Sequence, residues 1–170
     1  MKKVSILIIF QLVFIEISFG QEFDSIMKQA EQGDIEAQYN LGYKYRNGDG
    51  VPLNKEKAFY WLEKSSFQGD SRAQLFLAGM YYSGEGVEIN IEQAIYWYNK
   101  SAEQGEIYAQ LMLGSLYLNS NDTIKAEPNK AFHWFSKAAE QKSVIAQYQL
   151  GLMYENGEGA MIDSTQAFHW

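Results

Sequence analysis

The sequence writes one pattern four times, and this repetition constrains the fold more than any other feature. The stretch AQYNLGYKYRNGDGV begins at Ala37, and related stretches begin at Ala73, Ala109 and Ala146. In every copy Gln follows the Ala directly, Leu stands four positions after it and Tyr stands eight positions after it. Positions i, i+4 and i+8 lie close to one face of a helix. The pattern therefore predicts one amphipathic helix in each copy.

A second helix is predicted behind the first in three of the copies. An apolar stripe with i, i+3, i+4, i+7 spacing begins at Ala58, Ala94 and Ala131. Its second member is always Trp, namely Trp61, Trp97 and Trp134. Gly-x-Gly turns separate the two helices in copies one, two and four, and Asn54 and Asn90 are expected to cap the second helix. Each copy is therefore a helical hairpin.

The small residue after the repeated Leu is Gly42, Ala78, Gly114 or Gly151, and it is expected to let a neighbouring helix approach closely. A single hairpin cannot bury its apolar face, so the copies must stack. The predicted fold is all-α. The expected division is a half-repeat at 21–36, full repeats at 37–72, 73–108 and 109–145, and a truncated repeat at 146–170.

Composition excludes several classes of function. The formal net charge of -7 argues against nucleic-acid binding, which depends on Lys and Arg. No cysteine occurs in the 170 residues, so disulfides, thiolate zinc sites, iron–sulfur clusters and cysteine nucleophiles are excluded. An aromatic content of 15% is enough for a sizeable core and argues against disorder.

The first twenty residues have the layout of a cleavable secretory signal. Lys2 and Lys3 precede an apolar run, and Ser18 and Gly20 stand at the -3 and -1 positions before Gln21. A membrane anchor is the alternative, but the run is short for a spanning helix and contains Glu16. We expect cleavage after Gly20, an exported mature protein in the periplasm or outside the cell, and no stable membrane insertion after cleavage.

The repeated AQYNLGYKYRNGDGV...KAFYWLEKSSFQGD pattern resembles the Sel1-like repeat family, a relative of the tetratricopeptide repeats, over about residues 23–170. The resemblance implies an α/α superhelix of tetratricopeptide-like hairpins, with a concave groove that binds a protein or peptide. It implies a scaffold, with no catalytic residue, cofactor or metal. Similar bacterial proteins are often exported, and some act in the envelope or in host interaction.

If tetratricopeptide geometry carries over, positions two, six and nine after each starting Ala line the groove. An apolar and tyrosyl lining suits a peptide with apolar anchors; several of these residues could instead pack against the next repeat. The groove residues so predicted are Tyr39, Tyr43, Arg46, Leu75, Tyr82, Leu111, Leu118, Tyr148 and Leu152.

Three departures from the pattern are expected to change the structure. Copy three lacks the Gly-x-Gly turn and is one residue longer, so its loop is expected to differ in shape. Lys142 replaces the glycine of the turn after copy three, so the next hairpin is expected to sit differently. The last copy stops at Trp170, the counterpart of Trp134, which suggests a fragment without its cap.

Other motifs are better explained by structural roles than by catalysis or metal binding. Ser25-Ile26-Met27-Lys28 matches the S-x-x-K string of serine β-lactamases and penicillin-binding proteins, but no K-T-G follows it. β-lactamase-like or penicillin-binding activity remains an alternative function, and assembly through the final helix is a third. His133 and His169 are too far apart for a typical zinc pair, and each Gly-x-Gly turn offers one carboxylate, too few for calcium. Lys64, Lys100 and Lys137 are expected to form a solvated face.

Overall fold

A computed structural model describes residues 21–119, 126–159 and 163–169. These residues form helices joined by turns, and no β-strand occurs among them, so the predicted all-α fold class is confirmed. The chain divides into two compact units, Met1–Ala73 and Gln74–Trp170. The predicted signal segment, 1–20, lies outside the described residues. Within the described ranges, no helix has the length and apolar character needed to cross a membrane.

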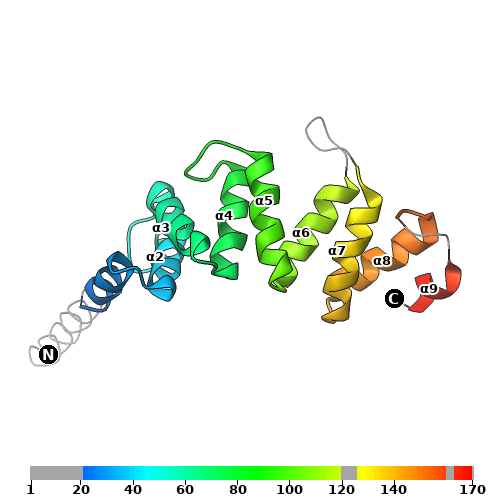
Figure 1. The fold of residues 1–170 in the computed structure, drawn as a ribbon, viewed down its shortest axis with the longest axis horizontal. Coiled ribbons are helices and arrows are strands. Elements are labelled where there is room, and N and C mark those ends of the chain that lie inside the picture. Colours follow the sequence, from blue (N-terminus) through cyan, green and yellow to red (C-terminus); the bar gives the residue numbers. More distant parts are fainter. Residues whose placement is uncertain (1–20, 120–125, 160–162, 170) are drawn as a thin grey trace, which may run out of the picture. The chain divides into compact units, whose positions relative to one another are not determined.

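The first unit contains a helix over residues 21–31, then α2 (Ile35–Asn47), α3 (Lys55–Phe67) and the start of α4 (Ser71–Ser83). Figure 1 shows α2 and α3 as a hairpin. A Cβ placed on Gly42 of α2 would lie 2.5 Å from Cγ of Leu62 in α3. The predicted close approach of neighbouring helices at this small residue is therefore confirmed.

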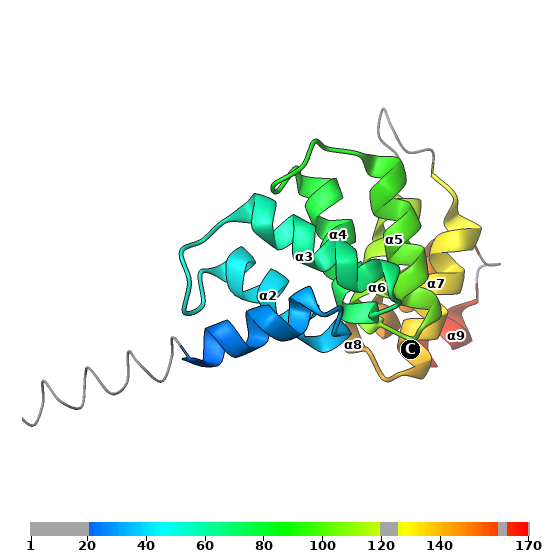
Figure 2. The ribbon, with the colours of Figure 1, turned by 60° about the vertical axis from the view of Figure 1, so that its left-hand side comes forward.

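The second unit continues α4 and adds α5 (Ile91–Glu103), α6 (Ile107–Leu118), α7 (Pro128–Glu140), α8 (Val144–Asn156) and α9 (Ser164–His169). Figures 1 and 2 show α4 beside α5 and α6 beside α7, as expected of successive hairpins. Gly114 of α6 repeats the close approach, because a Cβ there would lie 2.6 Å from Cε1 of Phe135 in α7.

The predicted apolar stripes form the core of each unit. The repeated Leu is fully buried in every copy, and the three Trp side chains are buried as well. Asn54 and Asn90 cap α3 and α5 by accepting hydrogen bonds from the backbone N–H groups of Lys57 and Gln93. The predicted caps are thereby confirmed, and hydrophobic spacing at 3.6 residues per turn accounts for which side chains are inside.

One backbone hydrogen bond closes the loop of every hairpin. The residue before each second helix donates its N–H to the carbonyl of the repeated Tyr, over 2.8 to 3.1 Å. The pairs are Asn54 with Tyr45, Asn90 with Tyr81, Glu127 with Tyr117 and Asp163 with Tyr154. The longer copy three keeps this bond, although α6 ends in an extended Asn119 where α2 and α8 end in a left-handed glycine. Residues 120–125 of that loop lie outside the described residues.

Lys142 does not alter the turn that it occupies, and a different placement of the next hairpin stays a prediction. Lys142 adopts the left-handed conformation of the glycines that it replaces, with φ of 65°, and is the one non-glycine residue with positive φ among the described residues. Its N–H donates to the carbonyl of Ala139, as that of Gly105 donates to Ala102. The turn therefore keeps its geometry, and the cost appears as backbone strain.

Candidate protein-binding surface

The first helix of the first three hairpins carries a buried glutamine, namely Gln38, Gln74 or Gln110. Gln38 donates its side-chain N–H to the carbonyl of Ala30 and accepts a hydrogen bond from Gln68 at 2.7 Å. Gln110 repeats the arrangement, donating to Ala102 and accepting from Gln141 at 3.0 Å. Because a buried amide is costly unless bonded, these contacts set the register of the first helices. The surface of those helices is therefore held by a rigid scaffold.

In the first unit, this surface is polar. Tyr39 and Tyr43 lie one turn apart on α2, with ring centroids 6.2 Å apart. The Arg72 guanidinium covers the Tyr39 ring at 4.1 Å and pairs with the carboxylates of Glu36 and Asp70. Stacking and ion pairing together satisfy this arginine within the protein.

The contacts within this cluster shift the pKa values of Arg72 and Tyr39. Hydrogen bonds that the Arg72 guanidinium donates to Asp70 and then to Glu36 raise the pKa of Arg72 above its ordinary value, so the group stays charged. Burial raises the pKa of the Tyr39 phenol, and the Arg72 cation acts in the opposite direction. Neither group is poised to exchange protons near neutral pH, which indicates that the cluster has a structural role.

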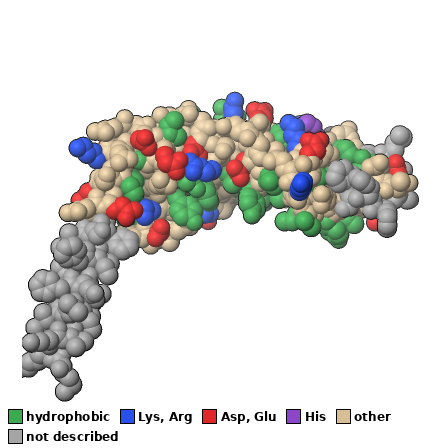
Figure 3. Space-filling view, turned by 90° about the horizontal axis from the view of Figure 1, so that it is seen from below, with side chains coloured by type: hydrophobic (Ala, Val, Ile, Leu, Met, Phe, Trp, Pro, Cys, Tyr) green, Lys and Arg blue, Asp and Glu red, His purple; other side chains and the backbone are tan. Residues whose placement is uncertain are grey.

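In the second unit, the corresponding surface is apolar and open. A depression of about 340 Å³, here named the turn pocket, lies where α7 passes into α8 beside the start of α6. Its lining combines apolar side chains with the residues of the turn: Ile107, Tyr108, Leu111, Gln141, Lys142, Ser143, Val144 and Ile145. Figure 3 shows hydrophobic side chains gathered on this face of the C-terminal half. Such a patch is unusual on a surface with no partner.

A second depression of about 400 Å³, here named the α8 groove, lies along α8. The two share Val144. The α8 groove is lined by Val144, Gln147, Tyr148, Gly151, Leu152, Glu155 and Ala167. The turn pocket includes Lys142 and the α8 groove includes Glu155, so the two depressions carry opposite charges.

A comparison of equivalent positions shows how the turn pocket differs from the contact between successive repeats in the first unit. The residue before the repeated Ala is Glu36 and Arg72 in the first unit, where the two form an ion pair. In the second unit the same positions are Tyr108 and Ile145, which are 67% and 59% exposed. Tyr108 stays exposed although a further first helix, α8, follows it. Stacking of repeats therefore does not cover this position.

Part of the α8 groove lies at a position whose equivalent in the preceding repeat is covered. Leu111 and Tyr148 occupy the same place in successive repeats, yet Leu111 is 9% exposed and Tyr148 is 63% exposed. Leu111 is covered because the turn over residues 141–145 lies beside it. The turn pocket is thus the stronger candidate for binding another molecule.

The structure places the predicted groove residues in different environments. Tyr43, Tyr82 and Tyr148 are exposed, Leu111 is buried, and Tyr39, Arg46, Leu75, Leu118 and Leu152 are half-buried. Tyr148 and Leu152 share the α8 groove, and Leu111 lines the turn pocket. The other predicted groove residues line neither of these two depressions.

Tyr108, Val144 and Ile145, the apolar residues most exposed in the turn pocket, were not among the predicted groove positions. They stand one or two positions before the repeated Ala, whereas tetratricopeptide geometry predicts groove residues only at positions after it. A signal was present in the sequence, since the residue before the Ala changes from Glu36 and Arg72 to Tyr108 and Ile145. This change of residue type is not part of the repeated pattern on which the groove prediction was based.

The lysines of the second helices do more than form a solvated face. Lys64 lies over the Tyr60 ring at 5.0 Å, and Lys100 lies over the Tyr96 ring at 5.9 Å. Lys137 lies over the Trp134 ring at 5.0 Å and is half-buried. His133 meets the edge of the same Trp134 ring. These contacts explain the recurrence of Lys three or four residues after an aromatic side chain.

The S-x-x-K string and the Gly-x-Gly carboxylates have ordinary surroundings in the described residues. Ser25 and Lys28 are exposed on the helix over 21–31, and the Ser25 hydroxyl accepts a hydrogen bond from Gln29. No group of three or more metal-ligating side chains occurs in the described ranges. Asp49 of the first Gly-x-Gly turn pairs with Lys44. The side chain of His169 lies outside the description.

Comparison with known proteins agrees with the repeat architecture. The chain is 46% identical over 41 residues to the Sel1-repeat-containing protein YbeQ of Escherichia coli, a match covering 24% of this chain and 13% of that protein. The structure resembles that of c5321, a protective antigen of uropathogenic Escherichia coli with an SLR fold, with a TM-score of 0.84 and 36% identity. It also resembles a Sel1 repeat protein from Oxalobacter formigenes, with a TM-score of 0.78 and 32% identity.

These relatives are longer than this chain. The similarity covers 89% of this chain and 32% of c5321, and 87% of this chain and 42% of the Oxalobacter protein. The model of the Sel1 repeat matches residues 35–70, 71–106, 107–143 and 144–170, so each copy starts two residues before the predicted boundary. Four matched repeats and an all-helical fold of stacked hairpins identify the chain as a member of the Sel1 repeat family.

Proposed function

We propose that this protein is an exported scaffold that binds a partner protein through the turn pocket and the adjoining α8 groove. The Sel1 repeat fold is generally a scaffold for protein–protein interaction, which supports the broad class. The observation that carries the location is the exposure of Tyr108 and Ile145, where the first unit has the Glu36–Arg72 ion pair. A segment with apolar side chains would gain the free energy of covering these residues.

Peptide selection tests this location directly. Random twelve-residue peptides displayed on phage would be selected on the protein expressed from Met1, and the enriched sequences measured as labelled synthetic peptides. We expect apolar sequences whose binding is lost in Ile145→Ser and in Tyr108→Ala. The matched controls are Tyr60→Ala and Tyr96→Ala, which remove equally large, half-exposed rings from second helices. Binding that is equally reduced by the control changes would contradict the proposed location.

Export is a separate part of the proposal. The basic start, the apolar run and the small residues before Gln21 support it. Expression in a bacterium, fractionation of the periplasm and intact-mass measurement provide the test. We expect a mature chain beginning at Gln21, and a full-length chain retained in the cytoplasm would contradict export. The penicillin-binding alternative has no support in the described residues, since Ser25 and Lys28 lie exposed on one helix and line neither depression.

A further inference from the structure

We propose that Lys142 gives the turn pocket its specificity by binding a carboxylate side chain, so that the partner is an apolar peptide segment bearing Asp or Glu. This inference rests on the proposed function and adds the chemical class of the occupant.

The conformation of Lys142 is the first observation. At the equivalent turns the chain has Gly33, Gly69 and Gly105, all with positive φ, and only here does a side chain occupy this conformation. The left-handed conformation is unfavourable for a residue with a Cβ. Strained backbone of this kind is often found where a side chain is needed for binding. A lysine at this one turn therefore calls for a role that glycine cannot fill.

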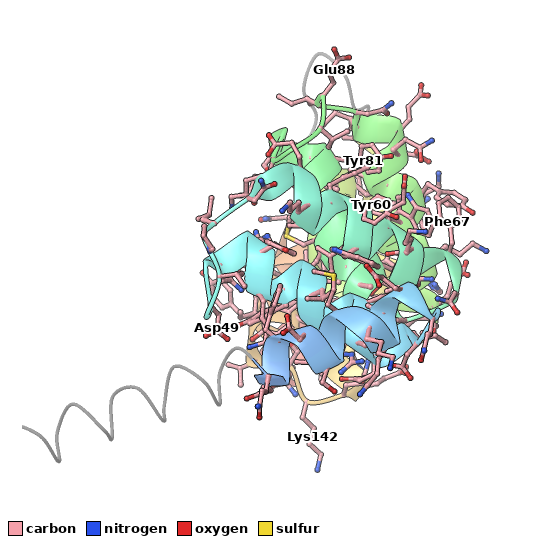
Figure 4. All side chains as sticks on the ribbon, turned by 90° about the vertical axis from the view of Figure 1, so that its left-hand side faces the viewer. Asp49, Tyr60, Phe67, Tyr81, Glu88 and Lys142 are labelled. Carbon is pink, nitrogen blue, oxygen red and sulfur yellow. The ribbon has the colours of Figure 1, made fainter. Side chains whose placement is uncertain are left out.

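The position and charge of Lys142 are the second observation. It lines the turn pocket beside Val144 and Ile145, which are 76% and 59% exposed. Within the described part of the chain, its ammonium group forms no ion pair, and Figure 4 shows its side chain extending away from the ribbon. Arg72 of the first unit, by contrast, is held by two carboxylates. Lys142 is therefore a cation available to another molecule.

The chemistry of the surroundings selects the occupant. The chain as a whole is acidic, with a net charge of -7, so a free cation beside an apolar depression is a local exception. Charge complementarity across an interface mainly supplies specificity and register. Val144 lines both the turn pocket and the α8 groove, so a peptide that extends beyond the turn pocket at Val144 would reach the α8 groove. A carboxylate on a side chain within the segment fits this arrangement better than a chain terminus.

The distinguishing experiment repeats the phage selection on variants of Lys142. Lys142→Gly removes the charge and relieves the strain, so the protein should remain folded. Lys142→Glu reverses the charge, and Lys142→Arg keeps it. On the wild type and Lys142→Arg, we expect enriched peptides that combine apolar residues with Asp or Glu. On Lys142→Gly the acidic preference should disappear, and on Lys142→Glu it should change to Lys or Arg.

A peptide from the wild-type selection gives the quantitative test. Replacement of its acidic residue by the amide should weaken binding about two- to fivefold, the range expected of an exposed ion pair. The same replacement should have no effect on binding to Lys142→Gly, and its full effect on binding to Lys100→Gln, a control that removes a lysine from a second helix.

The outcomes separate the two proposals. Apolar peptides that need Ile145 but show the same acidic content on wild type and Lys142→Glu would overturn the role of Lys142 and leave the proposed function standing. Failure to enrich any peptide that depends on Tyr108 or Ile145 would overturn both. Full displacement of the peptides by dodecanoate would identify a lipid-like occupant, and a concentration-dependent dimer abolished by Ile145→Ser would identify a second copy of the chain. Either result would overturn the acidic peptide as occupant.

Discussion

Gly114 of α6 faces the Phe135 ring of α7 so closely that a Cβ on the glycine would lie 2.6 Å from Cε1 of the ring. Phe135 is only 1% exposed, so its ring has no free space into which to move. Gly42 and Leu62 have the same relationship in the first unit. The approach of the two helices in these two hairpins is therefore set by the absence of a side chain at one position.

Substitution at Gly114 should destabilise the protein. Gly114→Ala forces a methyl group against the buried ring, and we expect the free energy of unfolding to fall by about 1–3 kcal/mol. Gly79→Ala is the matched control, because the nearest atom to its Cβ would be the Tyr98 hydroxyl at 3.7 Å. The control should gain up to about 1 kcal/mol from helix propensity. Urea denaturation followed by circular dichroism measures both, and equal effects of the same sign would contradict the close approach.

Lys142→Gly should stabilise the second unit. Relief of the left-handed strain, roughly 1–2 kcal/mol, is offset by about 0.4–1 kcal/mol from the more flexible unfolded chain. The net gain in unfolding free energy should be about 0.5–1 kcal/mol, measured by urea denaturation. Gly105→Ala provides the reverse change, because a Cβ on Gly105 meets no atom within 4 Å and only backbone conformation is altered. A loss of stability in Lys142→Gly would show that the lysine side chain itself holds the turn.

The glutamine pairs should contribute through their mutual hydrogen bond. A double-mutant cycle of Gln110→Ala and Gln141→Ala should give a coupling free energy of about 0.5–1.5 kcal/mol. Gln110→Ala alone should cost more than Gln141→Ala, since Gln110 is buried and also bonds to Ala102. Chemical denaturation of the four proteins is the measurement. Additive effects would mean that the pair does not act as a unit.

Tyr39 should make the first unit sensitive to alkaline pH. Because burial raises the pKa of its phenol in the folded state, the stability due to the neutral form is present below the ordinary pKa of 10.0 and is lost as the pH rises above it. Tyr39→Phe should therefore lose less stability than the wild type between about pH 8 and about pH 11. Tyr82→Phe, at an exposed tyrosine, is the control. An identical alkaline loss in Tyr39→Phe and the wild type would contradict the effect of burial.

Most of the fold follows from the sequence because it depends on periodic positions. The repeated Leu, the three Trp residues and the small residue at Gly42 or Gly114 specify which faces are buried and how closely the helices approach. The caps at Asn54 and Asn90 follow from the chemistry of an N-terminal helical turn. These features recur in register, so each copy confirms the interpretation of the others.

The candidate binding surface follows from the sequence much less well. Leu111 and Tyr148 are equivalent in the repeat, but one is buried and the other exposed because their neighbours differ. The replacement of a turn glycine by Lys142 suggests a changed backbone, yet a lysine can adopt the glycine conformation when the surrounding hydrogen bonds hold it there. Exposure and strain depend on packing in three dimensions, and a repeat pattern does not encode them.

The most direct test of the account is a map of where a selected peptide binds. Backbone amide spectra of the isotope-labelled protein would be recorded during titration with a peptide enriched on the wild type. We predict chemical-shift changes concentrated at residues 107–111 and 141–148, and their loss in Ile145→Ser. Changes concentrated around Tyr60, Tyr96 and His133 on the second helices would contradict the assignment of binding to the turn pocket.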